Sequence, residues 1–294
     1  MMQQIKKIFK IENNFSQKNS SFKPKKSLGQ NFLKSEPALM MMATAGEINH
    51  NDIILEIGPG KGALTTKLLM EAKKVLAIEK DRELFEFLKE KFSNEIKKGS
   101  FEIINGDILS FEIKNHGLRK GKYKIIANIP YNITGAIFKK FLSADIQPER
   151  MIILVQKEVA KRIVARDGKE SILSLSVKAY GIPKYIMKVG KRFFSPEPKV
   201  DSAIIEIIHI SKNNFQTKKE EENFFKIVRA GFAHKRKVLR KNLENLEINR
   251  NKEVGLPNII EKTFEKLKID PKTRAEDLKI ETWLELSRNL STDI

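Results

Sequence analysis

IILEIGPGKG, at residues 53–62, is an apolar run that passes directly into a glycine-rich turn. The apolar run is typical of a buried strand, and the glycines let the backbone turn sharply and approach a ligand near the start of the next helix. Residues 63–70 then show the spacing of an amphipathic helix. This strand, turn and helix predict the first unit of an open α/β sheet with a cofactor at the turn.

The same alternation continues along the first two thirds of the chain. Short apolar runs at 75–79, 101–104, 123–127 and 203–208 predict strands, and residues 82–92 predict a helix. Strands that alternate with helices are typical of a parallel sheet with crossovers. We therefore expect a Rossmann-like α/β domain over residues 23–210.

The last third of the chain has a different pattern. Residues 211–222 are polar and charged, which predicts a linker, and helical spacing follows at 224–232, 238–246, 259–267 and 283–290. We expect residues 211–294 to form a small, all-helical domain.

The charge indicates the kind of partner. The 294 residues include 56 Lys and Arg against 37 Asp and Glu, a net charge of +19, and the excess is clustered at 6–26, 157–166, 184–192 and 235–241. A polyanionic partner is expected, and nucleic acid is favoured over a membrane because no segment is apolar enough to span one.

The composition also narrows the chemistry and the location. The chain has no cysteine, which excludes disulfides, thiolate zinc sites and cysteine nucleophiles and fits a reducing, cytoplasmic setting. Residues 1–22 are polar and basic and lack a secretory signal, so a disordered basic arm is expected there.

The glycine-rich turn fits two classes of cofactor, S-adenosyl-L-methionine and a dinucleotide such as NAD. The spacing of Gly58, Gly60 and Ala63 also suits a dinucleotide, and Glu79, at the end of the second strand, can hold ribose hydroxyls in either case. Asp107 can accept a hydrogen bond from an adenine amino group, or it can simply form a turn. Because none of the four histidines has the neighbours that hydride chemistry needs, we expect S-adenosyl-L-methionine rather than NAD.

The sequence Asn128-Ile129-Pro130-Tyr131 follows a predicted strand, at the edge where open α/β sheets bind ligands. Pro130 has no N–H to pair with, so the turn leaves a free carbonyl beside an amide and an aromatic ring. Two acceptors and a stacking face suit a flat ring that bears an amino group. The motif therefore predicts methylation of an amino group on a nucleobase.

With these residues in view, the chain resembles the bacterial rRNA adenine N6,N6-dimethyltransferases over residues 24–290. Six blocks in the same order carry the resemblance: KSLGQNFL at 26–33, GPGKG at 58–62, NIPY at 128–131, QKEVAKR at 156–162, FSPEPKVDS at 194–202 and GFAHKRKVL at 231–239. Many members have Leu where this chain has Ile129, and Ile also occurs in the related large-subunit methyltransferases.

The resemblance implies an activity and a set of roles. Two adjacent adenosines near the 3′ end of small-subunit rRNA, in the immature small ribosomal subunit, would receive the methyl groups. Asn31 and Leu33 would close over the methionine end of the cofactor, while Gly58 would line the pocket. Glu79 would hold the ribose, Asp107 the adenine, and Asn128 the region beside the transferred methyl.

Aromatic side chains would hold the extruded adenine. Tyr131 is expected to stack on one face and Phe194 on the other, because Phe194 introduces a rigid Pro-x-Pro loop suited to presenting a ring. For Phe193 we expect packing in the core instead.

Cations predict the RNA-binding surface. Lys235, Arg236, Lys237 and Arg240 are expected on the outer face of a helix whose apolar side chains point inward. Arg162 and Arg166, four residues apart, are expected to extend that surface from another helix.

Three alternatives remain open. These are a large-subunit rRNA methyltransferase of the antibiotic-resistance type, a non-catalytic methyltransferase-fold factor in ribosome assembly or transcription, and an NAD enzyme. The chain is expected to be monomeric, by resemblance.

Overall fold

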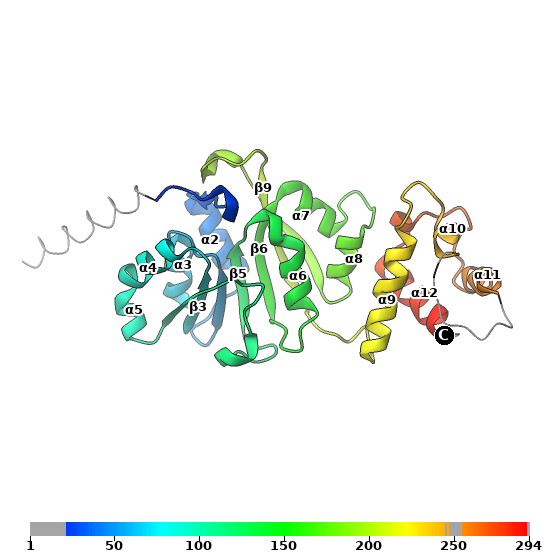
Figure 1. The fold of residues 1–294 in the computed structure, drawn as a ribbon, viewed down its shortest axis with the longest axis horizontal. Helices are drawn as coiled ribbons and strands as arrows, with labels where there is room; N and C mark the ends of the chain where they lie inside the picture. The colour runs from blue at the N-terminus through cyan, green and yellow to red at the C-terminus, as the bar shows by residue number, and fades with distance from the viewer. Residues whose placement is uncertain (1–21, 245, 247–254, 293–294) are drawn as a thin grey trace, which may run out of the picture.

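The computed structural model describes residues 22–244, 246 and 255–292, and a twisted sheet with helices on both faces dominates it (Figure 1). The sheet strands are β2 (Ile53–Ile57), β3 (Lys74–Glu79), β4 (Phe101–Asn105), β5 (Lys124–Asn128), β6 (Arg150–Gln156), β7 (Ile182–Val189) and β9 (Ser202–Ile208). They lie in the order β4-β3-β2-β5-β6-β9-β7. The strands from β4 to β6 are parallel, and β9 is antiparallel to both of its neighbours. The predicted Rossmann-like sheet is therefore confirmed.

Helices cover both faces of this sheet. The helices of this part are α2 (Glu36–Ala45), α3 (Ala63–Glu71), α4 (Arg82–Lys91), α5 (Ser93–Lys97), α6 (Thr134–Leu142), α7 (Lys157–Val164) and α8 (Ile172–Lys178). Side chains alternate across a strand, so Ile54 packs in the core with α2, α3 and α4, while Leu55 and Ile57 pack in the core with α6, α7 and α8. Each face of the sheet thus has its own apolar core.

The order of the strands creates a crevice. The chain passes outward from β2 through β3 to β4 and then returns to place β5 on the other side of β2. Open sheets bind ligands at the carboxyl ends of the strands where the order reverses in this way. The turns after β2 and β5, which carry Gly58 and Asn128, meet at this point.

A helical region follows the last strand. It contains α9 (Lys218–Gly231), α10 (Leu239–Leu243), α11 (Leu256–Lys266) and α12 (Ile280–Thr292). Trp283 is fully buried among these helices, and a Cβ on Gly231 would clash with its ring, so α9 and α12 can approach closely only with glycine there. The helical prediction is confirmed, whereas the domain division at residue 210 stays a prediction.

Helix α9 begins inside the polar segment expected to be a linker, because the Thr217 hydroxyl caps its first turn by accepting from the Glu220 N–H at 3.1 Å. The basic arm expected at residues 1–22 lies outside the described residues except for Phe22, whose ring packs edge-on against Phe87.

Candidate functional site

A cavity of about 730 Å³ opens at the carboxyl ends of β2, β3 and β5. Its volume is in the range of small-molecule sites. All the residues predicted to hold the cofactor line it, namely Asn31, Leu33, Gly58, Glu79, Asp107 and Asn128. The structure thus brings together side chains from separate parts of the sequence.

The glycine-rich turn forms a cradle in the wall of this cavity. Gly58 has a φ of +64°, and a Cβ built on it would meet nothing within 4 Å, so open space lies over its backbone. Its N–H donates to the Ile78 carbonyl at 2.9 Å, which ties the turn to β3. A ligand can therefore approach the main chain closely at this point, as the sequence predicted.

Glu79 ends β3 with its carboxylate in the cavity wall. Its Oε2 accepts from the Gly60 N–H at 3.1 Å and its Oε1 from the Asp81 N–H at 2.8 Å. Burial raises the pKa of Glu79, although these two hydrogen bonds favour the ionised form. The carboxylate is therefore fixed in place and has lone pairs left for ribose hydroxyls.

Asp107 lies two residues beyond the end of β4 rather than at it. The Lys80 ammonium donates to its Oδ2 at 2.8 Å, and the Leu109 N–H donates to its Oδ1 at 2.9 Å. The hydrogen bond from Lys80 is the main reason that the pKa of Asp107 is lowered. The residue therefore both forms a turn and contributes to the cavity wall.

The amide of Asn128 is held in one orientation. Its Nδ2 donates to the Asn31 carbonyl at 3.1 Å, whereas no described residue donates to its Oδ1. In the following turn the Pro130 carbonyl accepts from the Ile133 N–H at 3.3 Å. The amide oxygen of Asn128 and the carbonyl of Ile129 are therefore the acceptors that this turn can offer.

The two phenylalanines are placed the other way round from the expectation. Phe194 is only 4% exposed and packs in the core with α2, while Phe193 is 37% exposed with the Arg192 guanidinium 5.0 Å from its ring centre. The reason is pairing of β8 (Phe194–Ser195) with β1 (Phe32–Leu33), which turns the Phe194 ring inward. The prediction that Phe194 is presented to the site is wrong for this conformation.

Tyr131 lines the cavity as expected. Its hydroxyl shares a 2.6 Å hydrogen bond with the Ser202 hydroxyl at the start of β9. Burial raises the pKa of Tyr131, so the phenol is neutral at physiological pH. The ring is thus anchored at its far end.

Glu56 belongs to the site and was missed from the sequence. It is 1% exposed, lines the cavity, and accepts from the Thr65 hydroxyl at 2.7 Å. Burial raises the pKa of Glu56 to about 8, with a smaller contribution from the nearby Glu79. The available signal was an acid inside an otherwise apolar strand.

The expected pair of arginines is not on one helix. Helix α7 ends at Val164, where Ala165 takes a positive φ, and Arg166 lies beyond with its guanidinium 4.9 Å from the centre of the Tyr185 ring. Arg162 remains on α7. The helical pairing of the two side chains is therefore wrong.

The cations at 235–237 also lie elsewhere than predicted. They occupy a turn before α10, because the Lys237 N–H donates to the His234 carbonyl at 3.0 Å and the helix begins only at Leu239. Arg240 is on α10, where it pairs with Glu244 at 3.8 Å and Glu261 at 3.4 Å. Three exposed cations on a turn replace the expected basic helix face.

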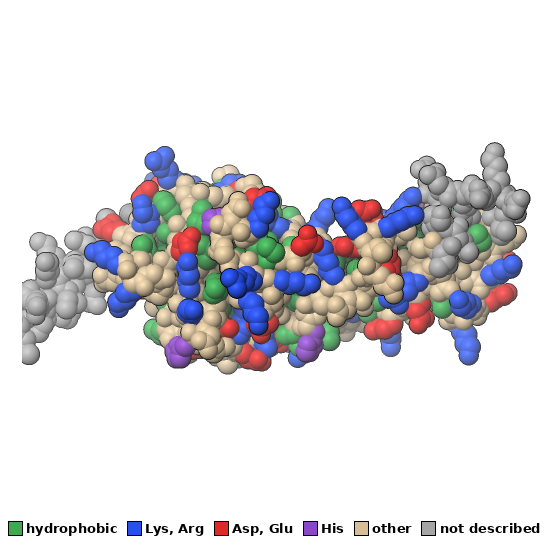
Figure 2. Space-filling model, turned by 90° about the horizontal axis from the view of Figure 1, so that it is seen from below, with side chains coloured by type: hydrophobic (Ala, Val, Ile, Leu, Met, Phe, Trp, Pro, Cys, Tyr) green, Lys and Arg blue, Asp and Glu red, His purple; other side chains and the backbone are tan. Residues whose placement is uncertain are grey.

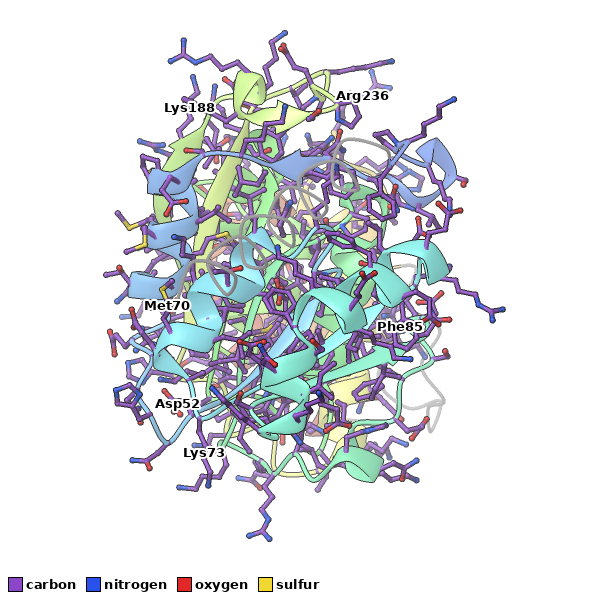
Figure 3. The ribbon with its side chains drawn as sticks, turned by 90° about the vertical axis from the view of Figure 1, so that its left-hand side faces the viewer. Asp52, Met70, Lys73, Phe85, Lys188 and Arg236 are labelled. Carbon is purple, nitrogen blue, oxygen red and sulfur yellow. The ribbon has the colours of Figure 1, made fainter. Side chains whose placement is uncertain are left out.

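A larger cavity, about 1290 Å³, lies between α6, α8 and α9. Lys139, Arg162, Arg229 and Lys235 line it, and the first three form no ion pair with any described residue. Figure 2 shows Lys and Arg side chains on both sides of the notch between the sheet part and the helical part. In the view of Figure 3, along the long axis of the molecule, Arg236 and Lys188 lie on the upper side, opposite Asp52 and Lys73.

The described residues offer neither a metal site nor a membrane-spanning helix. They contain no group of His, Cys, Asp and Glu side chains arranged to hold a metal ion. Within the same residues no helix is both long and apolar enough to cross a bilayer.

Known proteins match nearly the whole chain. The family model described as "Ribosomal RNA adenine dimethylase" matches residues 21–292. A relative from Dehalococcoides mccartyi (strain CBDB1), named ribosomal RNA small subunit methyltransferase A, is 40% identical over 269 residues, which cover 90% of this chain and 88% of that protein.

Two solved structures share the fold. A dimethyladenosine transferase from Plasmodium falciparum is 26% identical with a TM-score of 0.76, covering 89% of this chain and 98% of that chain. The 23S rRNA methyltransferase ErmE is 25% identical with a TM-score of 0.70, covering 88% and 99%. The chain therefore belongs to the ribosomal RNA adenine dimethylase family.

Proposed function

We propose that this protein transfers methyl groups from S-adenosyl-L-methionine to N6 of two adjacent adenosines near the 3′ end of small-subunit rRNA. The product is N6,N6-dimethyladenosine, made while the small subunit matures. The observation that carries the proposal is the fixed amide of Asn128, whose Oδ1 accepts from no described residue and can bind an amino group in the wall of a cofactor-sized cavity. The name of the Dehalococcoides relative supports small-subunit rRNA as the substrate.

The cavity fits the cofactor. Its cradle over Gly58, the fixed carboxylate of Glu79 and the carboxylate of Asp107 suit a nucleoside with ribose hydroxyls and an amino group. Asn31 and Leu33 would hold the methionine end from the opposite wall. When bound, S-adenosyl-L-methionine supplies an electrophilic methyl group.

The protein's own part is to prepare the adenine nitrogen. The N6 lone pair is delocalised into the ring, so the amino group is a weak nucleophile. Hydrogen bonds from N6–H to Asn128 Oδ1 and to the Ile129 carbonyl favour a pyramidal nitrogen whose lone pair points out of the ring plane. The same acceptors stabilise the positive charge that develops there, and the proton then leaves to solvent.

Tyr131 provides the stacking face. Its bond to Ser202 holds the ring in the cavity wall, and a stack on a base returns roughly 1–3 kcal/mol of the cost of extruding it. A stack on Phe194 requires that β8 move away from β1, because that ring lies in the core.

The RNA would bind along the cationic cavity between the two parts of the chain. Phosphates can bind to cationic side chains on both sides of this cavity, which are Lys139 and Arg162 on one side and Arg229 and Lys235 on the other. This cavity reaches Gly135, two residues from Ile133 in the wall of the cofactor cavity, so one strand of RNA can contact both. Arg236 and Lys237 would add phosphate contacts, and Arg166 would contribute beside Tyr185.

We place the protein in the cytoplasm as a monomer bound to the immature small subunit. Methylation of large-subunit rRNA is the second candidate, which the fold shared with the 23S rRNA methyltransferase ErmE supports.

The test is to incubate the protein with labelled S-adenosyl-L-methionine and either immature small subunits or large-subunit rRNA, and to map the methyl groups by primer extension. Two adjacent adenosines near the 3′ end of the small-subunit rRNA are expected to be modified. Label only in large-subunit rRNA would select the second candidate. Cofactor binding without transfer to either RNA would favour a non-catalytic assembly factor.

A further inference from the structure

Residues 22–35, which we call the strap, run along the cofactor cavity and line it. They lie above α2 in Figure 1 and supply much of one wall of the cavity. The strap contacts the turns after three different strands. A Cβ on Gly60 would lie 3.0 Å from the Phe32 ring of the strap, which shows how closely the strap covers the turn after β2.

One end of the strap is fastened to the turn after β3. The Lys25 ammonium lies 2.7 Å from Asp81 Oδ1 and 3.0 Å from Glu83, and Gln30 Nε2 donates to Asp81 Oδ2 at 2.8 Å. The side chain of Asp81 is only 3% exposed. Its burial opposes ionisation, but the hydrogen bonds from Lys25 and Gln30 outweigh that effect and the pKa of Asp81 is lowered. The acceptor is therefore a buried carboxylate that binds two side chains of the strap.

The next residues of the strap reach the turn after β5. Asn31 directly follows Gln30, and its carbonyl accepts the Nδ2–H of Asn128 at 3.1 Å. Gly29 lies so close to this turn that a Cβ on it would be 3.4 Å from Asn132 Oδ1 and 3.5 Å from Pro130. The orientation of the Asn128 amide thus depends on where the strap holds the Asn31 carbonyl.

The contacts of the strap with Asp81 and with Asn128 connect the proposed cofactor site to the proposed site of the target adenine. Asp81 also donates its N–H to Glu79, the carboxylate proposed to hold the cofactor ribose. A continuous series of contacts therefore runs from Glu79 through Asp81, Gln30 and Asn31 to Asn128.

We propose that Lys25, Gln30 and Asp81 are positioning residues for the methyl transfer. They hold the strap so that the Asn31 carbonyl binds Nδ2 of Asn128, which leaves Oδ1 facing the target amino group. This inference deepens the proposed function and rests on it. A purely structural role for the three residues would change stability alone and leave the Asn128 amide as it is.

Three variants separate these two roles. Gln30→Glu places a second carboxylate against Asp81 and should detach the strap. Asp81→Asn keeps the helix cap that Asp81 gives to α4, because Asn caps as well as Asp, but it removes one acceptor. The double variant restores a hydrogen bond with donor and acceptor exchanged. Lys23→Gln, at an exposed strap position, makes the same change in net charge as Gln30→Glu and is the control.

The first readout does not depend on activity. In protein labelled with ¹⁵N-asparagine, the side-chain amide signals of Asn128 are identified by their loss in Asn128→Ala. We expect these signals to shift in Gln30→Glu and Asp81→Asn, to return in the double variant, and to stay unchanged in Lys23→Gln. Unshifted signals in both folded single variants would overturn the proposal. Should Gln30→Glu fail to fold, the amide signals of Asp81→Asn alone decide between the two roles.

The second readout is kcat at saturating cofactor and RNA. A misplaced acceptor should lower kcat of Gln30→Glu on the order of 10- to 100-fold, with recovery in the double variant. A double variant that folds with the wild-type melting temperature but stays as slow as Gln30→Glu would contradict the positioning role. Failure of the proposed function itself looks different, because wild-type protein would then transfer no methyl group to small-subunit rRNA while the amide signals still report on the strap.

Discussion

At the scale of single residues, the amide nitrogen and the amide oxygen of Asn128 have different roles. Its nitrogen is held by the Asn31 carbonyl, and its oxygen has no donor among the described residues. We expect Asn128→Ala to lower single-turnover methyl transfer by about 100-fold or more, because an acceptor for developing charge is lost. Calorimetry should show cofactor affinity nearly unchanged, since Gly58 and Glu79 remain.

The matched control for that experiment is Asn115→Ala, which removes an exposed amide that does not line the cavity. Wild-type rates are expected for it. Were transfer to survive in Asn128→Ala, the argument that the amide oxygen prepares the lone pair would be wrong.

Glu56 gives a pH dependence of stability. Its pKa is raised from 4.5 to about 8, so the folded state binds this proton more tightly than the unfolded state does. Its contribution to the free energy of unfolding is therefore most favourable below pH 4.5, falls as the pH rises to about 8, and then stays constant.

The variant Glu56→Gln can still accept from the Thr65 hydroxyl but cannot ionise. We expect its free energy of unfolding to exceed that of the wild type by a few kcal/mol, roughly, at pH 8 and by much less at pH 5. Urea denaturation at both pH values measures the difference. Equal differences at the two pH values would show that Glu56 does not carry the effect.

The neighbours Phe193 and Phe194 show what a sequence leaves undecided at this scale. Alternation places one ring inward and one outward but does not say which. The register was decided by pairing of Leu33 with Phe194, more than 150 residues apart in the chain. The positions of Gly58 and Glu79, by contrast, follow from the strands that precede them, and both residues line the cavity, while their roles toward the cofactor stay predictions.

At the scale of elements, the sequence predicts the bounds of a helix or strand well when its whole pattern of apolar residues lies in one short segment. Strand β2 has the predicted bounds and α3 differs by one residue. The helix expected at 238–246 is only α10 (Leu239–Leu243), and the cations expected on its outer face at 235–237 lie in the turn before it, which the Lys237 N–H closes by donating to the His234 carbonyl. A run of cations fits a helix face and an exposed turn equally well, so composition alone could not separate them.

The turn itself makes a prediction about RNA binding. Lys235, Arg236 and Lys237 are exposed, and the nearest carboxylate to Lys235, that of Glu276, is 4.0 Å away. Replacing the three with Ala should weaken binding and lower the slope of log affinity against log salt by about 2–3, since each phosphate contact contributes roughly one unit.

The control is replacement of Lys262, Lys272 and Lys279, three exposed lysines of the same helical region, which gives the same loss of net charge. Fluorescence anisotropy with a small-subunit rRNA fragment at several salt concentrations measures both slopes. If the two triple variants lose the same slope, the turn acts only through net charge and makes no phosphate contact.

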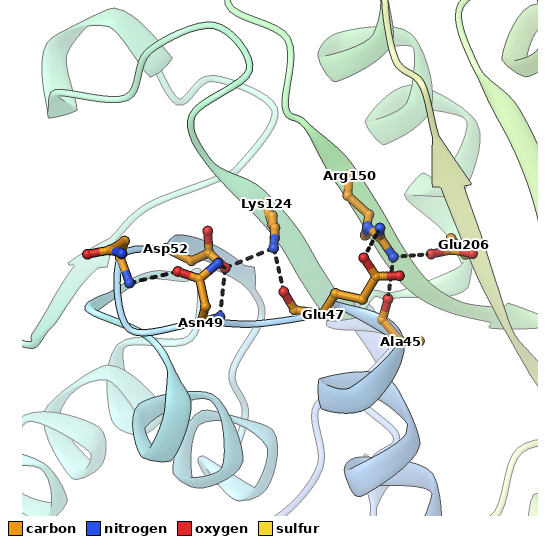
Figure 4. Close-up of polar contacts among 8 residues, drawn as sticks. Ala45, Glu47, Asn49, Asp52, Lys124, Arg150 and Glu206 are labelled. Atoms are coloured by element: carbon orange, nitrogen blue, oxygen red, sulfur yellow. Dashed lines mark hydrogen bonds and ion pairs between the residues drawn. The ribbon is translucent and has the colours of Figure 1, made fainter.

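At the scale of the whole molecule, binding and stabilisation occupy opposite ends of the sheet. The carboxyl ends of β2, β3 and β5 carry the cofactor cavity. At the amino ends, buried Lys124 and half-buried Arg150 join β5 and β6 to the segment after α2, as Figure 4 shows. Arg150 binds Glu206 of β9 at 2.5 Å and also pairs with Glu47, so this network spans the parallel and antiparallel parts of the sheet.

This separation predicts that the network can be weakened without harm to the site. Lys124 is 4% exposed and donates to the Glu47 carbonyl at 2.7 Å and to Asp52 at 2.8 Å. Lys124→Met keeps the apolar part of the side chain but leaves the Glu47 carbonyl and Asp52 without their donor. The free energy of unfolding should therefore fall by about 2–3 kcal/mol. Exposed Lys122→Met, two residues away, should change it by about 0.5 kcal/mol or less.

Urea denaturation gives these values, and calorimetry should find the same cofactor affinity in both variants below their unfolding transitions. A loss of cofactor affinity in Lys124→Met that matches its loss of stability would mean that the two ends of the sheet are coupled, because a buried ammonium at the start of β5 would then be helping to place Asn128 at its end.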